Sequence, residues 1–171
     1  MSGGLHYRGK LYRALNPIYA KEPLSGAGAA RFGGRFNAKS VPALYMSLSP
    51  LTALREANQV GALQPTTLVC FEADIESIFD TRDLAALACE GMTPETLAAS
   101  TWRDEMKTGE ARGQTFAGRL NKAGYCGLLV RSFAPGSTGD DLNLVLWTWG
   151  ADAPARLILI DDEGRLSPAR S

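Results

Sequence analysis

The sequence predicts an α+β fold, with strands toward both ends of the chain and helices between them. Residues rich in β-formers occur at 66–73 and 127–133, while helical periodicity fills 80–123. Strands and helices do not alternate regularly, which disfavours a doubly wound parallel sheet. The 171 residues contain no internal repeat and no low-complexity linker, so one domain over 1–171 is expected.

The N-terminal elements follow from local signals. A first strand is expected at 10–15, ending at a turn-prone Asn-Pro pair. The stretch 23–37 is rich in glycine and is expected to be an ordered loop. A short strand at 43–47 precedes Ser49-Pro50, which suits the N-cap and first position of a helix over 50–59.

The second half of the chain changes from strand to helix and back. The strand at 66–73 continues as an extended or turn segment at 75–79. Within the helical region, Thr93-Pro94-Glu95 is a typical helix start and Gly124 a typical stop. Three further strands are expected, at 127–133, 142–149 and 156–160, the last closed by a turn at 161–164.

Charge and cysteine content exclude several function classes. Eighteen basic residues balance eighteen acidic ones, which disfavours nucleic-acid or membrane binding through bulk charge. Three scattered cysteines and a single histidine, His6, fit neither a disulfide framework nor a structural zinc site, so no metal is expected. The N-terminus lacks the apolar stretch of a signal peptide, and a cytoplasmic protein is expected.

The most informative local cluster is Gly33-Gly34-Arg35-Phe36-Asn37. Adjacent glycines allow positive φ and close approach of a ligand, and the Arg35 guanidinium suits phosphate or carboxylate. A tight turn carrying a surface arginine is an equally open interpretation. The spacing matches neither the Walker loop nor the dinucleotide GxGxxG motif.

Two other candidates have ordinary structural explanations. Glu56 lies about half a helical turn from the apolar stripe of Leu51 and Leu54, so periodicity alone indicates a solvated glutamate. Tyr45 lies in an apolar strand, where a tyrosine is usually a core or rim residue with its hydroxyl bonded locally.

Taken in order, the motifs resemble a known family, the RES domain, which is named after an arginine, a glutamate and a serine. The similarity extends from residue 10 to about 148 and is densest between 12 and 56. It rests on Tyr12-Arg13, Ser25-Gly26, Gly28-Ala29, the 33–37 cluster, 42–47, Ala53-Leu54-Arg55-Glu56 and 124–132.

This resemblance implies a fold similar to ADP-ribosyltransferase toxins and the role of toxin in a bacterial toxin–antitoxin pair. It implies NAD as the substrate, consumed by hydrolysis or phosphorolysis or used to transfer ADP-ribose to a host protein. The implied partner is an antitoxin with an Xre-like helix-turn-helix. The residues that match the family's site are Arg13, Arg35, Tyr45, Glu56 and Ser132.

These matches give a hypothesis for each role. Glu56 is expected to stabilise positive charge on the ribose as nicotinamide departs. Arginines would bind the pyrophosphate, and Tyr45 would stack on nicotinamide or ribose. Arg35 and Glu56 should then lie at opposite ends of one cavity. The expected pyrophosphate ligands are Arg13, Arg31 and Arg35, with Ser132 and Asn143 as neutral donors on the opposite wall.

Two alternatives stay open. Within enzymology, NAD loss is either the reaction itself or incidental to protein ADP-ribosylation. Outside it, the chain is a non-catalytic nucleotide- or nucleic-acid-binding module, which the arginines and Trp102, Trp147 and Trp149 would favour and the neutral net charge disfavours. Trp147 and Trp149 alternate along one strand, which is typical of core or interface aromatics.

Overall fold

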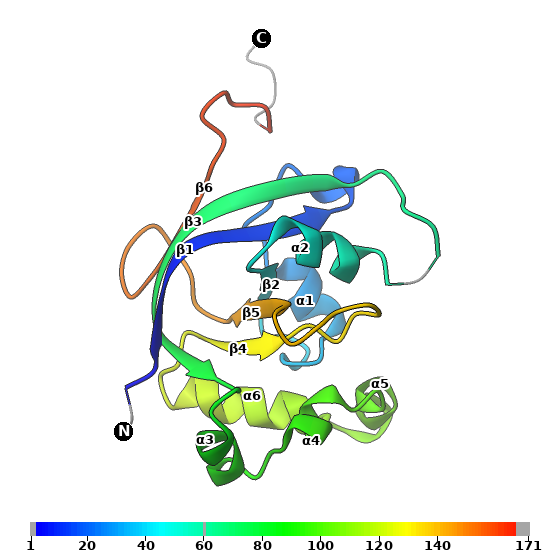
Figure 1. The fold of residues 1–171 in the computed structure, drawn as a ribbon, viewed down its shortest axis with the longest axis vertical. Helices are drawn as coiled ribbons and strands as arrows, with labels where there is room; N and C mark the ends of the chain where they lie inside the picture. Colours follow the sequence, from blue (N-terminus) through cyan, green and yellow to red (C-terminus); the bar gives the residue numbers. More distant parts are fainter. Residues whose placement is uncertain (1–2, 60, 167–171) are drawn as a thin grey trace.

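The sheet closes on itself into a small barrel with one strand added at its side (Figure 1). The computed structural model describes residues 3–59 and 61–166. The strand order is β1-β2-β5-β4-β3-β6, and an additional β1–β3 pairing joins the ring. Among the described strand pairs, only β3 and β4 run parallel. The strands are β1 (Leu5–Leu15), β2 (Leu44–Ser47), β3 (Thr67–Asp80), β4 (Gly127–Arg131), β5 (Leu142–Leu146) and β6 (Ala155–Leu159).

Two long strands give the barrel its shape. β1 and β3 pair from Leu5↔Ile78 to Leu15↔Thr67 and arch over the short strands β2, β5 and β4 in Figure 1. β1 also pairs with β2 through Tyr12↔Ser47, so β1 has β3 on one side and β2 on the other, which closes the ring. Alternate side chains of the strands point inward, and the barrel is filled by large apolar residues that include Leu11, Phe71, Ile75 and Leu144.

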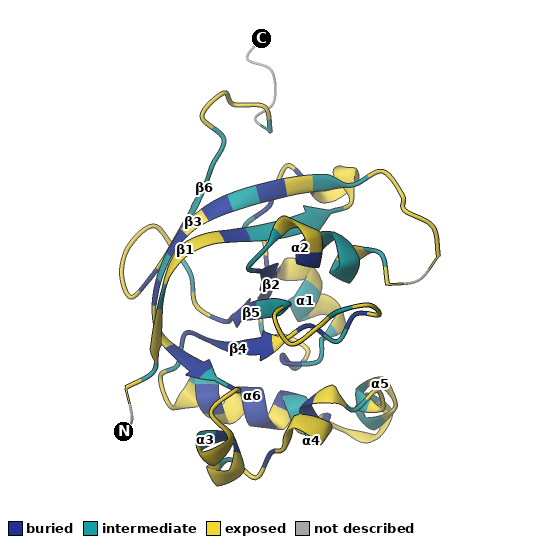
Figure 2. Cartoon of the chain, viewed as in Figure 1, coloured by how far each residue is buried: buried dark blue, intermediate teal, exposed yellow. Residues whose placement is uncertain are grey.

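A second apolar layer lies between the sheet and the helices below it in Figure 1. Figure 2 shows buried positions along α6, which packs against β4. This layer contains Phe79, Leu87, Phe116, Leu120 and Val145. The helices are α1 (Ala27–Phe32), α2 (Pro50–Ala57), α3 (Leu84–Cys89), α4 (Pro94–Ala98), α5 (Trp102–Glu105) and α6 (Arg112–Lys122), with short 3-10 turns at Pro17–Tyr19 and Met106–Thr108.

The expectation of a loop throughout 23–37 is wrong, because six of these residues form α1. Its alanines favour a helix more strongly than its single internal glycine opposes one. The helix ends where Gly33 adopts φ 70°, and its Ala29 carbonyl accepts from Gly33 N and Asn37 Nδ2 at 2.8 Å each. The Gly33–Asn37 turn is therefore tied to the end of α1.

The helical prediction for 80–123 is confirmed in type but divides into four short helices. Thr93 caps α4 as expected, and Gly91 and Gly109 interrupt the region with positive φ. The strands expected at 127–133 and 142–149 end earlier, at Arg131 and Leu146.

The tryptophans that follow β5 are core aromatics, as the sequence indicated. Trp147 Nε1 donates to Phe36 O at 2.8 Å and Trp149 Nε1 donates to Leu24 O at 3.0 Å. Cys126 is buried, whereas Cys70 is half-buried. Among the described residues, no helix is long and apolar enough to cross a membrane.

Candidate active site

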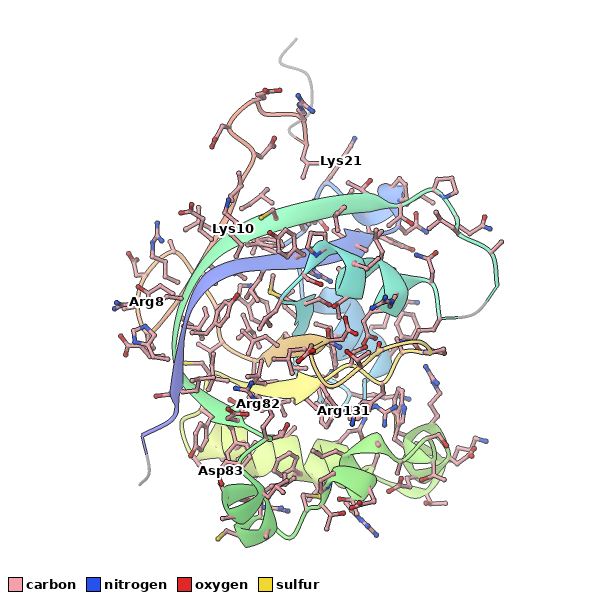
Figure 3. All side chains as sticks on the ribbon, viewed as in Figure 1. Arg8, Lys10, Lys21, Arg82, Asp83 and Arg131 are labelled. Carbon is pink, nitrogen blue, oxygen red and sulfur yellow. The ribbon has the colours of Figure 1, made fainter. Side chains whose placement is uncertain are left out.

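A cleft of about 230 Å³ opens between β2, β4, β5, α2 and α5. Glu56 and Arg35 both line it, so the structure brings the two groups of the central hypothesis into one cavity. Figure 3 labels Arg131, the last residue of β4, near this part of the molecule. The lining residues are Gly34, Arg35, Phe36, Tyr45, Glu56, Gln59, Trp102, Arg103, Val130, Arg131, Phe133, Asn143 and Val145.

Glu56 reaches the cleft because α2 buries an unexpected face. The predicted cap is confirmed: Ser49 Oγ accepts from Thr52 N at 3.1 Å, with Pro50 at the first position. The expected apolar stripe is wrong, because Leu51 is 56% exposed while Thr52 and Ala53 are buried. Glu56 lies three and four residues after this buried pair and therefore shares their face.

The Glu56 carboxylate is held by three neutral donors. Oε1 accepts from Asn143 Nδ2 at 2.6 Å and from Ser132 Oγ, and Oε2 accepts from Gln59 Nε2 at 2.8 Å. None of these donors carries a charge, so the carboxylate is fixed in position without being neutralised by an ion pair.

The donors are themselves oriented by a second set of bonds. Ser47 Oγ on β2 donates to Asn143 Oδ1 at 2.7 Å, which directs the amide nitrogen toward Glu56. Ser132 is buried and accepts from Ser137 Oγ at 2.9 Å. Ser132 and Asn143, which were expected to be neutral donors in the site, thus contact the glutamate directly.

Arg35 is anchored between aromatic rings and backbone carbonyls. Its Nη1 donates to Leu97 O at 3.1 Å and to Ala99 O at 2.8 Å. Its Cζ lies 4.8 Å from the Phe133 ring centroid and 5.7 Å from that of Trp102, distances typical of cation–π contacts. Partial burial, and then the nearby Arg103 charge, lower the pKa of Arg35.

Tyr45 supports the glycine turn with its hydroxyl and lines the cleft with its ring. The hydroxyl donates to Asn37 Oδ1 at 2.7 Å and accepts from Phe36 N at 3.0 Å, and its burial raises the pKa of Tyr45. Gly34 has no room for a side chain, since a Cβ there would lie 2.6 Å from Asn37 Oδ1. The local bonding expected for this tyrosine is therefore present.

The other two arginines of the hypothesis lie elsewhere. Arg13 and Arg31 line a second hollow of about 520 Å³, together with Asn16, Tyr19 and Phe32, and the structure does not bring them into the Glu56 cleft. Arg13 Nη1 donates to Pro23 O at 2.6 Å, and burial lowers the pKa of Arg13 to about 10.

Sequence reasoning missed several residues of the cleft. Trp102 and Arg103 come from α5, in a region without any family motif, and Gln59 and Phe133 lack a signal of their own. Asn37, which belongs to the recognised cluster, is buried, and its amide donates to Ala29 O and Val41 O. The role of Asn37 in fixing the turn beneath Tyr45 is visible only from its contacts in the folded structure.

The barrel, the flanking helices and a cleft that combines one fixed carboxylate with several guanidinium groups define an α+β protein with a site suited to an anionic ligand. The model of the RES domain matches residues 10–168, and the chain belongs to this family.

The α+β fold is also found in a solved structure. The crystal structure of the M. tuberculosis MbcT-MbcA toxin-antitoxin complex is similar with a TM-score of 0.61 and 21% sequence identity, over 93% of this chain and 85% of that chain. At this identity the likeness concerns the fold, and the expected α+β fold is confirmed. No curated protein matches the chain.

Proposed function

We propose that this protein is the toxin of a bacterial toxin–antitoxin pair and that it consumes NAD by cleaving the bond between nicotinamide and ribose. Membership of the RES domain family supports this proposal. The observation that carries it is the Glu56 carboxylate, bonded to three neutral donors in the same cleft as the Arg35 guanidinium.

The chemistry follows from the charges that develop during cleavage. The C1′–N bond breaks with its electron pair on the ring nitrogen, so nicotinamide leaves as a neutral molecule and the ribose becomes oxocarbenium-like. A carboxylate next to the sugar stabilises this state more than the ground state, where the positive charge lies on the nicotinamide ring. An acceptor oxygen then bonds to C1′ and its proton is released. Glu56 is the catalytic residue of this mechanism.

The hydrogen bonds around Glu56 serve to position it. Because Asn143 and Ser132 donate to the same oxygen, Oε1, they fix the side-chain rotamer before substrate binds. A preorganised anion needs little reorganisation as the transition state forms. Asn143 and Ser132 are therefore positioning residues in this proposal.

The size of the cleft sets which part of NAD it takes. We assign the nicotinamide ribose and the adjacent phosphate to the Glu56 cleft, with the Tyr45 ring as an aromatic wall. The second hollow lies close to this cleft, because Phe32 lines the hollow and Gly34 lines the cleft. The Cα atoms of residues two apart in the chain are separated by at most about 7.6 Å. The remaining half of the dinucleotide would extend into this neighbouring hollow, toward Arg13 and Arg31.

The proposal also includes a protein that neutralises the toxin and an acceptor for ADP-ribose. We infer a cognate antitoxin, with the Xre-like helix-turn-helix expected from the family resemblance, as the neutralising partner. The similar structure from M. tuberculosis is that of a toxin-antitoxin complex, which supports a partner of this kind. Water, phosphate or a host protein is the acceptor of ADP-ribose, and the cytoplasm, where NAD is available, is the expected location.

Incubation of the purified protein with NAD tests the proposal. Nicotinamide should appear in equal amount to the NAD lost, with ADP-ribose as the second product in water and ADP-ribose 1″-phosphate if phosphate is the acceptor. Mass spectrometry of host proteins added to the reaction would detect protein ADP-ribosylation. Binding of NAD with no release of nicotinamide under any of these conditions would support the non-catalytic alternative.

A further inference from the structure

Helix α5 adds a pair of residues to the cleft that the family motifs do not include. Trp102 and Arg103 both line the cavity that contains Glu56, although they are 46 and 47 residues away from it along the chain. Trp102 is half-buried and Arg103 is exposed. The pair therefore combines an aromatic wall with a guanidinium that is accessible to a ligand.

The pair is held in place by packing around Arg35. Arg103 Cζ lies 4.5 Å from the Trp102 ring centroid, and Arg35 Cζ lies 5.7 Å from it. The carbonyls that accept from Arg35 Nη1 belong to Leu97 and Ala99, just before α5. The glycine turn and the α5 segment are thus joined through Arg35, and Trp102 carries a cation–π contact to each arginine.

The cleft carries more positive charge than its single carboxylate can balance. Arg35, Arg103 and Arg131 line it, and none of them forms an ion pair within residues 3–59 and 61–166. Glu56 is bonded to Ser132, Asn143 and Gln59, all neutral. Guanidinium groups that line one cleft without ion-pair partners are well placed to donate together to a bound anion such as a phosphate.

Resting on the proposed function, we propose that Arg103, stacked on Trp102, binds the phosphate next to the nicotinamide ribose together with Arg35. Arg35 keeps Nη2 and Nε for this contact, because its described hydrogen bonds use Nη1. Arg103 approaches from α5 and Arg35 from the Gly33–Asn37 turn, so a phosphate between them receives donors from two directions. Helix α5 is then a substrate-recognition element, and Arg103 is a specificity-determining residue for phosphorylated ligands.

Binding of ADP-ribose, which keeps the pyrophosphate and is not cleaved by the proposed reaction, tests this assignment. Calorimetry should give a Kd about tenfold weaker for Arg103→Gln than for the wild type, and an intermediate value for Arg103→Lys, because lysine keeps the charge without the planar fork. Arg112→Gln is the matched control: Arg112 is exposed, lies close to α5 and does not line the cleft, so its Kd should stay within twofold.

Two further readouts separate a direct contact from a general structural effect. The Kd of Arg103→Gln should depend less steeply on salt than that of the wild type, because one phosphate contact is lost. ADP-ribose should also change the tryptophan fluorescence of the wild type and leave that of Trp102→Phe almost unchanged, since Trp147 is buried and neither it nor Trp149 lines the cleft.

The assignment is overturned if Arg103→Gln binds ADP-ribose as tightly as the wild type or is weakened no more than Arg112→Gln. If the wild type still consumes NAD in that case, the proposed function stands and only the role of α5 falls. If the wild type neither consumes NAD nor binds ADP-ribose, both proposals fall together.

Discussion

Replacing Glu56 by glutamine removes the charge of the carboxylate and keeps its shape. The amide oxygen can still accept from Ser132 and Asn143, and Gln59 can turn its own amide to accept from the new NH₂ group, so the three described contacts can persist. The change therefore tests charge separately from the architecture of the cleft.

The size of the effect follows from Coulomb's law. A unit negative charge about 4 Å from a unit positive charge, at an effective dielectric constant of about 20, contributes about 4 kcal/mol. Because Glu56 is half-buried and lines an open cleft, this dielectric constant suits it better than that of a dry interior. About 4 kcal/mol of lost transition-state stabilisation corresponds to a roughly thousandfold lower rate.

The assay is release of nicotinamide from NAD by purified Glu56→Gln and wild-type protein. We expect kcat to fall roughly a thousandfold while KM changes by less than about threefold, since the charge acts mainly in the transition state. Glu72→Gln on β3, where Glu72 is exposed and outside the cleft, should behave as the wild type. A loss of less than tenfold in Glu56→Gln, with the fold intact, would refute this electrostatic role.

Three other substitutions test the surroundings of the site. Asn143→Ala removes one donor from the Glu56 carboxylate and should lower kcat about 10- to 100-fold in the same assay, through lost positioning. Gly34→Ala should lower the free energy of unfolding by about 1–3 kcal/mol in urea titrations, because its Cβ meets a side-chain oxygen at 2.6 Å. Asp141 has a lowered pKa, first through the Thr138 backbone donor, so its stabilising effect is present above the ordinary aspartate pKa near 4 and is lost as pH falls through the folded value. Asp141→Asn should therefore flatten the acid side of the stability profile.

The Gly34→Ala prediction has a matched control in the same part of the chain. Gly28→Ala lies in α1 with nothing near its Cβ, so the same substitution there should leave stability unchanged or raise it by up to about 1 kcal/mol. Equal losses at both glycines would contradict the steric reason given for Gly34. Unchanged turnover in Asn143→Ala, or an unchanged acid transition in Asp141→Asn, would contradict the other two.

Much of the fold could be predicted because local signals and tertiary contacts agree. The cap formed by Ser49 and Pro50, the apolar run of β3 and the Thr93 cap of α4 all act over a few residues, and the structure contains each of them. The closure of the barrel could not be predicted, because it depends on pairing between β1 and β3, more than fifty residues apart.

The predicted buried face of α2 is wrong, because the type of side chain does not indicate burial correctly in this helix. Leucines usually mark the buried face of a helix, yet Leu51 is exposed because the buried side of α2 carries Thr52 and Ala53. Thr52 Oγ1 donates to Asp141 Oδ1 at 2.7 Å, so this face is held partly by polar contacts that hydrophobic periodicity does not detect.

The sequence predicted that Arg35 and Glu56 share one cavity, which they do, but it did not indicate several other residues that line this cavity. The resemblance singled out Arg35, Tyr45 and Glu56, and all three line one cleft. The resemblance also singled out Arg13, and Arg31 was added as a further candidate beside the glycine turn; both line another hollow. Order along the chain cannot distinguish these cases, because the distance between side chains depends on how β1 and α1 pack in three dimensions.

A crystal structure of Glu56→Gln soaked with NAD would test the central claim most directly. The nicotinamide ribose should lie in the cleft with C1′ about 4 Å from the substituted side chain on α2, and the adjacent phosphate should contact Arg35. NAD bound on another face, or with its nicotinamide ribose outside this cleft, would contradict the account.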